Sequence, residues 1–242
     1  MGPQGMNSQR ILLVIPCFNE QRAIAPLLHE ITAVGTTWDT LVVDDGSSDE
    51  TFRVASAISP TVRLVTNLGI GGAVQTGIRY AARHDFDFCV QIDGDGQHPP
   101  AEVTKLLDAY ALTPRSIIVG SRYLENDSFR STWSRRLGKR AIARTLALLF
   151  PGTAISDPTS GMRLLDRDAI RLFAQRYPHD FPEPISLAWA RRAGLSVGEV
   201  AVNMRAREHG TSSIAGVRPI AYMVRVLGYI VLARISRASS KW

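Results

Sequence analysis

Short apolar runs alternate with segments of helical period over the first half of the chain. Strands are expected at 11–18, 40–45, 62–66, 88–93 and 116–122. Helices are expected between them at 20–34, 49–58, 72–83 and 99–112. Near-continuous apolar strands separated by helices are typical of a mostly parallel sheet that is buried on both faces. The pattern therefore predicts an α/β fold.

The second half of the chain has longer helical segments and fewer strands. Helices are expected at 135–150 and 183–193, and strands near 162–165 and at 197–204. Residues 219–233 are apolar except for Arg225, but a membrane-spanning helix needs about 20 apolar residues. This segment is predicted either to lie at an interface or to pack on the domain's own core. The expected organisation is a disordered tail at 1–9, one domain at 10–215 and a C-terminal interfacial or docking helix at 216–242.

Polar side chains follow five successive strands of the first half. They are Asn19 and Glu20, Asp44 and Asp45, Asn67, Asp93 and Asp95, and Arg122. In open parallel sheets, ligands bind beyond the carboxyl ends of the strands. Five polar clusters in succession therefore predict a single polar site at one edge of the sheet.

Asp93 and Asp95 flank a glycine at the end of the fourth strand. Gly94 and Gly96 let the backbone turn sharply and approach a ligand. Two carboxylates with an open side suit Mg²⁺ or Mn²⁺ shared with a substrate diphosphate, and such a cation would neutralise a leaving nucleoside diphosphate. A plain acidic turn has the same composition, so the tripeptide alone leaves both interpretations open.

Two further motifs adjoin this predicted site. In residues 42–49, a buried strand is followed by two acids and a turn, where Asp45 is expected to bind a base or ribose and Asp49 to cap the next helix. The glycine-rich segment 67–72 lacks the lysine of a P-loop and does not give GxGxxG. It is expected to serve close packing of a helix against the sheet rather than phosphate binding.

Charge is divided unequally along the chain. Residues 1–110 carry 7 basic and 13 acidic side chains, whereas residues 111–242 carry 21 and 9. An acidic half suits a cation site, and a basic half suits phosphates or an anionic membrane surface, although solvated helix faces would give the same counts. Within 135–150, basic residues at i, i+4 and i+8 form one stripe beside an apolar stripe. This pattern suits a helix at an anionic membrane surface, and a solvated surface helix would show it as well. The basic stripe consists of Arg136, Arg140 and Arg144.

The remaining composition is that of an ordinary globular protein, with 45% hydrophobic and 21% charged residues. Cys17 and Cys89 both lie in apolar runs and are expected to be reduced core residues. Aromatic residues are not interleaved with the basic cluster as stacking platforms would be, so no nucleic-acid partner is expected.

Three motifs resemble those of family 2 glycosyltransferases with the GT-A fold. They are Ile15-Pro16-Cys17-Phe18-Asn19-Glu20, Asp44-Asp45-Gly46-Ser47-Ser48-Asp49 and Asp93-Gly94-Asp95-Gly96-Gln97-His98-Pro99-Pro100. Three others resemble the dolichyl/polyprenyl-phosphate mannose or glucose synthases of that family. They are Gly120-Ser121-Arg122-Tyr123, Asp157-Pro158-Thr159-Ser160-Gly161-Met162-Arg163 and Arg207-Glu208-His209-Gly210-Thr211-Ser212-Ser213. The resemblance covers about residues 10–215. It implies a Rossmann-like, mostly parallel sheet with helices on both faces, followed here by C-terminal amphipathic helices.

The resemblance also implies a nucleotide-sugar donor and assigns residues to its binding. Asp45 and the backbone near Pro16 would contact the nucleoside. Asn19 and Glu20 would belong to the same donor site, and Arg207 would reach the donor diphosphate once its loop closes.

A divalent cation, Mg²⁺ or Mn²⁺, is implied in the same way. Asp93, Asp95 and Gln97 would surround it, with Asp93 also in the donor site. Asp95 would then be a catalytic residue, because the cation that it holds neutralises the leaving group.

The acceptor is implied by basic residues. The resemblance suggests that Arg122 binds an acceptor phosphate together with Arg135, or with Arg136 because the gap is uncertain, and that Asp157 lines the sugar pocket. A phosphate monoester has a second pKa of about 6, so it needs arginines to position it and no general base. The predicted reaction is inverting transfer of a hexose from a GDP-mannose or UDP-glucose type of donor to a polyprenyl phosphate, with Asp95, Arg122 and Asp157 as catalytic residues.

The alternative is a sugar hydroxyl acceptor in cell-surface polysaccharide assembly, which needs a general base. Glu183 and Asp157 are the candidates, although Pro184 follows Glu183 where enzymes of that kind commonly carry a second acid. A polyprenyl phosphate acceptor implies a cytoplasmic protein in peripheral contact with the cytoplasmic face of a membrane, directly or through a separate small membrane protein.

Overall fold

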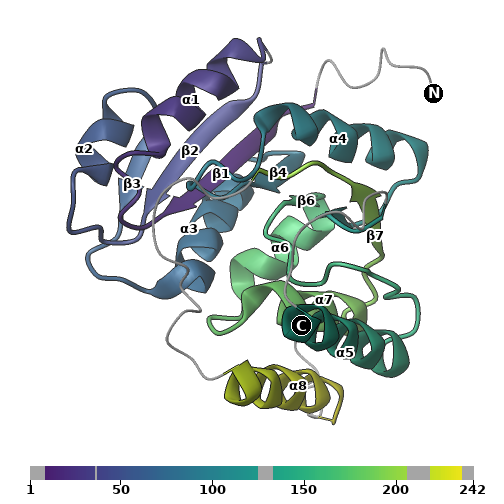
Figure 1. The fold of residues 1–242 in the computed structure, drawn as a ribbon. Helices are drawn as coiled ribbons and strands as arrows, with labels where there is room; N and C mark the ends of the chain where they lie inside the picture. Colours follow the sequence, from purple (N-terminus) through teal and green to yellow (C-terminus); the bar gives the residue numbers. More distant parts are fainter. Residues whose placement is uncertain (1–8, 36, 125–132, 206–218, 236–242) are drawn as a thin grey trace.

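The computed structural model describes residues 9–35, 37–124, 133–205 and 219–235 (Figure 1). They form a seven-stranded sheet in the order β3-β2-β1-β4-β6-β5-β7. The strands are β1 (Ile11–Cys17), β2 (Asp39–Asp44), β3 (Thr61–Arg63), β4 (Phe88–Gln91), β5 (Ile117–Ser121), β6 (Arg163–Leu165) and β7 (Val197–Ala201). The helices are α1 (Ile24–Ala33), α2 (Thr51–Ser56), α3 (Gly69–Arg83), the short η2 (Pro100–Glu102), α4 (Val103–Leu112), α5 (Trp133–Leu149), α6 (Arg167–Gln175), α7 (Pro182–Arg192) and α8 (Pro219–Ile235). The predicted α/β fold is confirmed.

The sheet is mostly parallel, as predicted, and β6 is the strand that departs from the pattern. It runs antiparallel to both β4 and β5, whereas the other paired strands run parallel. The residues that precede β6 therefore lie at the same edge as the residues that follow β1, β2, β4 and β5. This reversal brings segment 157–161 to the edge where the carboxylates gather.

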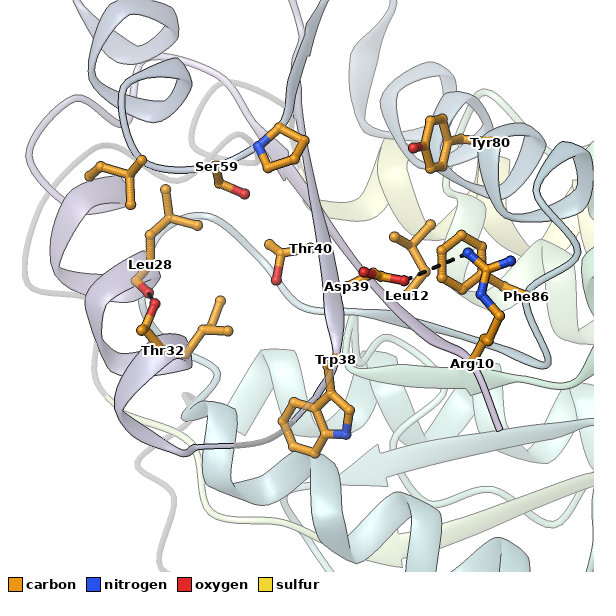
Figure 2. Close-up of a pocket in the computed structure, with 13 residues that line it drawn as sticks. Arg10, Leu12, Leu28, Thr32, Trp38, Asp39, Thr40, Ser59, Tyr80 and Phe86 are labelled. Carbon is orange, nitrogen blue, oxygen red and sulfur yellow. Dashed lines mark hydrogen bonds and ion pairs between the residues drawn. The ribbon is translucent and has the colours of Figure 1, made fainter. Parts of the chain in front are cut away.

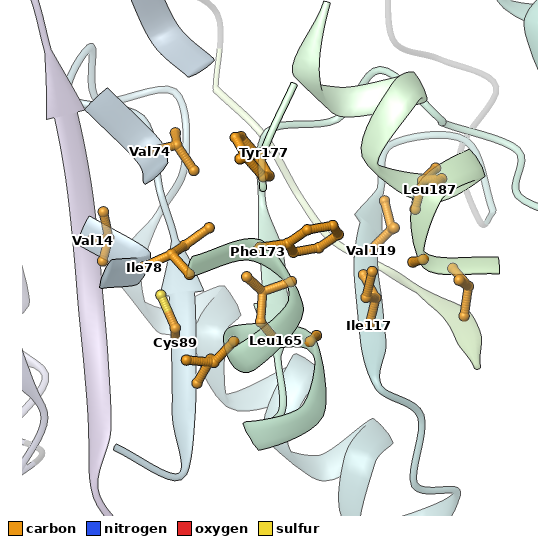
Figure 3. Packing of buried hydrophobic residues seen from close by; sticks show 14 of the residues in the cluster. Val14, Val74, Ile78, Cys89, Ile117, Val119, Leu165, Phe173, Tyr177 and Leu187 are labelled. Carbon is orange, nitrogen blue, oxygen red and sulfur yellow. The ribbon is translucent and has the colours of Figure 1, made fainter. Parts of the chain in front are cut away.

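Both faces of the sheet are buried, which explains the continuous apolar runs. Successive side chains of a strand point to opposite faces. In β1, Leu12 and Val14 join a cluster that contains residues of α3, α6 and α7, whereas Leu13 and Ile15 join a second cluster under α1 and α4. Figure 3 shows part of the first cluster, with Phe173 of α6 among side chains of the sheet and of α3.

Element boundaries differ from the predicted ones mainly at strand ends. β2 ends at Asp44 and β4 at Gln91, so Asp45 and Asp93 lie in loops rather than in strands. Helix α6 was not expected. Its signals were present in the chain, because Asp166 caps the helix by accepting a hydrogen bond from Ala169 N at 2.9 Å and its apolar residues recur at helical spacing. The N-cap of α2 is Glu50, one residue after the expected Asp49, although Asp49 does accept a hydrogen bond at 2.9 Å from the N–H of Thr51, the first residue of the helix.

The C-terminal helix α8 packs against α5 and α7 with one face. Val226, Ile230 and Ala233 of that face are buried in the same cluster as α5 and α7. The ring of Phe181, just before α7, makes an edge contact with Tyr222, with ring centroids 4.7 Å apart. None of the helices in the described part of the chain has the length and apolarity needed to cross a membrane. The segments 1–8 and 236–242, which belong to the predicted tail and C-terminal region, lie outside the described residues.

Candidate active site

The loops after β1 and β2 are tied together at the carboxyl edge of the sheet. Asn19, whose φ is 56°, donates its backbone N–H to Ser47 Oγ at 2.9 Å, and its side-chain oxygen accepts from Ser48 N at 2.9 Å. Glu20 N donates to Thr51 Oγ1 at 2.8 Å. The two residues expected at the donor site thus stand beside the loop that follows Asp45, and their backbone fixes the position of that loop.

Asp45 is buried and holds the next loop in place. Its Oδ1 accepts a hydrogen bond from Leu68 N at 2.7 Å. Burial raises the pKa of Asp45, although backbone N–H groups of Leu68 and Gly69 oppose the rise. The carboxylate that is expected to contact a nucleoside therefore also positions the start of α3.

The glycine-rich segment at the start of α3 serves close packing, as predicted, but against a different partner. A Cβ on Gly71 would come under 3.0 Å from backbone atoms of Pro178 and His179. The close contact is with the loop after α6, whereas Gly77, six residues further along α3, approaches Val14 of the sheet. Only glycine lets the loop and the helix approach this closely.

The Asp93-Gly94-Asp95 turn crosses directly over the end of β1. Gly94 N donates to Pro16 O at 3.2 Å, and a Cβ on Gly94 would lie 2.8 Å from the Cβ of Cys17. Pro16, expected near the nucleoside, is therefore part of the support beneath the two carboxylates. The tight crossing explains why a glycine stands between them.

Asp93 is held from two sides. Its backbone N–H donates to Nδ1 of the buried His98 at 2.9 Å, and Gln91 Nε2 donates to its Oδ1 at 3.4 Å. Gly161, from the segment before β6, packs on the carboxylate, because a Cβ there would lie 2.8 Å from Asp93 Oδ1. The side chain of Asp93 remains 35% exposed.

Asp95 and Gln97 connect this turn to the segment that follows β7. Asp95 Oδ1 accepts from Gln97 N at 3.0 Å. Arg205 N donates to Gln97 O at 2.9 Å, and Gln97 Nε2 donates to Arg205 O at 3.3 Å. The chain therefore enters segment 206–218 from a point beside Gln97. Arg207 lies in that segment, outside the described residues.

Arg122 and Asp157 form a bidentate ion pair at the same edge. Arg122 Nε donates to Asp157 Oδ2 at 2.5 Å, and Nη2 donates to Oδ1 at 2.8 Å. Asp157 is fully buried, whereas the Arg122 side chain is 19% exposed. Burial raises the pKa of Asp157, but the hydrogen bonds and charge of Arg122 outweigh it and hold the pKa below its usual value. Burial alone would lower the pKa of Arg122, but the hydrogen bonds and the charge of Asp157 outweigh burial and raise this pKa above its usual value.

This ion pair bears on the expected role of Asp157. A carboxylate with a lowered pKa and two hydrogen bonds from a guanidinium is a weak proton acceptor. The geometry therefore favours an orienting role for Asp157, which holds Arg122 in place, rather than a role as general base.

Helix α5 is joined to this ion pair through Tyr123. Lys139 Nζ donates to Tyr123 Oη at 2.6 Å and lies 4.5 Å from the centroid of its ring. Arg135 and Arg136 belong to the first turns of α5, but their side chains lie outside the described residues.

Arg163 stabilises the segment before β6, a role that the sequence analysis did not predict. Its buried guanidinium donates to Ser160 O and Pro158 O, each at 2.9 Å, and to Ser186 Oγ at 2.8 Å. It thereby fixes the segment that carries Asp157 and Gly161 against α7. The sequence contained a signal for this role, namely a single arginine at an otherwise apolar strand, because a buried charge needs fixed polar partners.

Glu183 stands in the first turn of α7 near Arg163. Burial raises the pKa of Glu183, and the charge of Arg163 opposes the rise. A carboxyl group with a raised pKa is closer to the range in which general bases work at neutral pH.

The carboxylates fit a cation that is completed by a substrate. In the described residues, no three His, Cys, Asp or Glu side chains gather closely enough to hold a metal ion by themselves. Asp93 and Asp95 nevertheless offer hard oxygen donors at one turn. Mg²⁺ is commonly bound by one or two carboxylates together with substrate phosphates, so two aspartates fit this type of site.

A separate pocket of about 380 Å³ lies at the opposite edge of the sheet (Figure 2). Its lining includes Arg10 and Asp39, which precede or begin β1 and β2 and form an ion pair at 3.8 Å, together with Trp38 and Phe86. None of the predicted site residues in the described part of the chain lines it.

The arrangement of the sheet matches solved structures of the GT-A fold. A structure of glucosyl-3-phosphoglycerate synthase from Mycobacterium tuberculosis, in complex with Mn²⁺, uridine diphosphate and phosphoglyceric acid, superposes with a TM-score of 0.71 at 21% identity and covers 98% of this chain and 82% of that one. At this identity, the likeness shows the fold.

The glycosyl transferase family 2 model matches residues 12–173, and the chain belongs to that family. It is 29% identical over 241 residues to a polyprenol monophosphomannose synthase from Mycolicibacterium smegmatis, covering 96% of this chain and 91% of the relative. It is 28% identical to an undecaprenyl-phosphate mannosyltransferase from Micrococcus luteus, covering 86% and 88%. A UDP-N-acetylglucosamine–dolichyl-phosphate N-acetylglucosaminyltransferase from Methanococcus voltae is 25% identical, with 81% and 86% covered.

Proposed function

We propose that this protein transfers a hexose from a nucleotide sugar to a polyprenyl phosphate, with inversion at the anomeric carbon. The observation that carries the proposal is the Arg122–Asp157 ion pair, which stands at the same sheet edge as Asp93 and Asp95. Membership of family 2 and the names of the relatives, which act on polyprenol, undecaprenyl and dolichyl phosphates, support it.

The donor would lie over the loops after β1, β2 and β4. Asp45 and the backbone of Pro16 would contact the nucleoside, and Asn19 and Glu20 would belong to the loop beside it. Asp93 and Asp95, with Gln97 next to them, would hold Mg²⁺ or Mn²⁺ against the diphosphate. A cation bound there stabilises the charge that develops on the leaving group. Arg207 is proposed to reach the diphosphate from segment 206–218.

The acceptor phosphate would bind at Arg122, with Arg135 or Arg136 as a second cation. Asp157 fixes the plane of the Arg122 guanidinium, so the donors that recognise a phosphate are oriented before it binds. The phosphate is already anionic near neutral pH because its second pKa is about 6. No general base is therefore needed, which agrees with the lowered pKa of Asp157.

One observation favours a second candidate function, transfer to a sugar hydroxyl. Burial raises the pKa of Glu183, as a general base for a hydroxyl would require. Glu183 stands close to Arg163 rather than at an open edge, and Pro184 follows it. We therefore place the phosphate acceptor first.

A transfer assay separates the two candidates. The purified chain would be incubated with Mn²⁺ and radiolabelled GDP-mannose or UDP-glucose, with either polyprenyl phosphate or a soluble oligosaccharide as acceptor. Label in the lipid phase supports the proposal, and label on the oligosaccharide alone supports the second candidate. Asp95→Asn is the inactive variant, and Asp108→Asn, at an exposed position of α4, is its matched control.

A further inference from the structure

Glu199 of β7 holds the segment before Asp157 against the sheet. Both of its carboxylate oxygens accept a hydrogen bond from Ser156 N at 2.9 Å, and its Oε2 also accepts from Ser156 Oγ at 2.9 Å. Ser156 directly precedes Asp157 in the segment that joins α5 to β6. The carboxylate of Glu199 therefore fixes one side of the Arg122–Asp157 ion pair through the residue next to it.

The same hydrogen bonds extend to the other partner of the ion pair. Ser156 Oγ lies 2.8 Å from Ser121 Oγ at the end of β5, and Tyr123 N donates to Ser121 Oγ at 3.3 Å. Ser121 and Tyr123 are the residues on either side of Arg122. The side chain of Glu199 is thus connected to the neighbours of both Arg122 and Asp157, although the segments that carry them lie far apart in the sequence.

The hydrogen bonds of this chain all run toward the carboxylate. A carboxylate only accepts hydrogen bonds, whereas a serine hydroxyl has a single proton to donate. Since Ser156 Oγ gives its proton to Glu199, the proton between the two hydroxyls comes from Ser121, which in turn accepts from the N–H of Tyr123. Ser121 is only 1% exposed, so its hydroxyl needs these partners within the protein. The negative end of the chain, Glu199, sets its direction.

We propose that Glu199 is a positioning residue, which keeps Arg122 and Asp157 in register through Ser156 and Ser121. A bidentate pair depends on the distance and the plane of both groups, so a shift of Ser156 would weaken the pair and let the guanidinium rotate. In the transfer reaction, Glu199 would then favour binding of the acceptor phosphate at Arg122 without contacting it. This consequence for the acceptor rests on the proposed function, whereas the positioning of the ion pair does not.

A double-mutant cycle in urea unfolding tests the positioning. Glu199→Gln keeps the size of the side chain but leaves one accepting oxygen and turns N–H donors toward Ser156. In this background, the effect of Asp157→Asn on the unfolding equilibrium constant should be smaller by about threefold or more, because members of one hydrogen-bond network do not act independently. Asp168→Asn, in an exposed pair beyond the other end of β6, should combine with Glu199→Gln additively to within about twofold. Additive effects of Glu199→Gln and Asp157→Asn would overturn the proposal.

A second pair of variants tests the hydroxyl link itself. Ser156 is exposed, so Ser156→Ala and Ser156→Thr should both fold, as circular dichroism and thermal melting would verify. Ser156→Thr keeps the hydroxyl and should behave like the wild type in the same cycle with Asp157→Asn. Ser156→Ala keeps only the backbone bond to Glu199 and should show part of the loss of coupling, whereas Ser56→Ala, at an exposed serine of α2, should show none. Equal behaviour of Ser156→Ala and Ser156→Thr would refute the link through the hydroxyls.

Transfer kinetics test the consequence for the acceptor. In Glu199→Gln, the KM for polyprenyl phosphate should rise by roughly tenfold, the effect of about one hydrogen bond to a charged group, with little change in kcat. Thermal shifts with Mn²⁺ and a nucleoside diphosphate should match those of the wild type, because the proposed donor loops follow β1, β2 and β4. A folded variant with an unchanged acceptor KM, or with an equal loss of nucleotide binding, would overturn this consequence. No transfer to polyprenyl phosphate by the wild type would refute the proposed function instead, and the unfolding cycle would still decide on the positioning.

Discussion

Removing the charge of Asp157 should destabilise the protein more than any similar change at its surface. In Asp157→Asn, the Arg122 guanidinium loses its carboxylate while its side chain remains only 19% exposed. Breaking a buried ion pair by removing one partner costs about 3–5 kcal/mol. Because Arg122 keeps some contact with water, we expect the lower part of that range, about 3–4 kcal/mol. For a chain of this size, this corresponds to a fall in Tm of roughly 5–15 °C.

The destabilisation by Asp157→Asn should depend on pH in a defined direction. The folded-state pKa of Asp157 lies below its usual value, so its contribution to stability is present above the unfolded-state pKa of 3.8 and is lost as the pH falls through the lower folded-state pKa. The difference between wild type and variant should therefore be full at pH 7 and shrink in acid.

Urea unfolding followed by circular dichroism at several pH values measures this difference. Asp168→Asn is the matched control, because Asp168 pairs with Arg171 at 3.2 Å with both side chains more than 60% exposed. Exposed pairs contribute at most about 1 kcal/mol. If Asp157→Asn costs no more than Asp168→Asn, or if its cost does not depend on pH, the interpretation of the Arg122–Asp157 pair is refuted.

The remaining predictions concern packing, thiols and the site. Gly71→Ala should destabilise by about 1–3 kcal/mol, since its Cβ would collide with the backbone of Pro178 and His179, and unfolding curves would show this. Cys17 and Cys89 should react with a thiol reagent at pH 8 only when the protein unfolds. The reason is that burial raises the pKa of both thiols, and that of Cys89 rises to about 12. Fast labelling of the native protein would contradict this prediction. A chelator should abolish sugar transfer and Mn²⁺ should restore it, as measured by released nucleoside diphosphate. Asp95→Ala should remove activity even at saturating Mn²⁺, whereas Arg122→Ala should chiefly raise the acceptor KM, and a normal acceptor KM would count against its assignment.

The sequence predicted the sheet and its polar edge because both depend on local patterns. Buried parallel strands are continuous apolar runs, and their carboxyl ends meet at one edge. The expected gathering of residues after β1, β2, β4 and β5 followed from this rule. The free, buried cysteines followed from the apolar runs around them.

What could not be predicted depends on contacts between distant segments. The direction of β6 is set by its pairing with β4 and β5, and that direction brings Asp157 to Arg122 and Gly161 to Asp93. No local pattern reports such a pairing. The support that Arg163 gives to segment 157–161 depends on the same placement.

The central claim is tested most directly by the chemical identity of the product. The purified chain would be given a nucleotide sugar, Mn²⁺ and a polyprenyl phosphate of defined length, and the lipid product would be examined by mass spectrometry beside the nucleoside diphosphate that is released. We predict one hexose per lipid, linked through the phosphate, with nucleoside diphosphate in equal amount. Nucleoside diphosphate accompanied only by free sugar, or a hexose linked to a hydroxyl acceptor instead, would contradict the account.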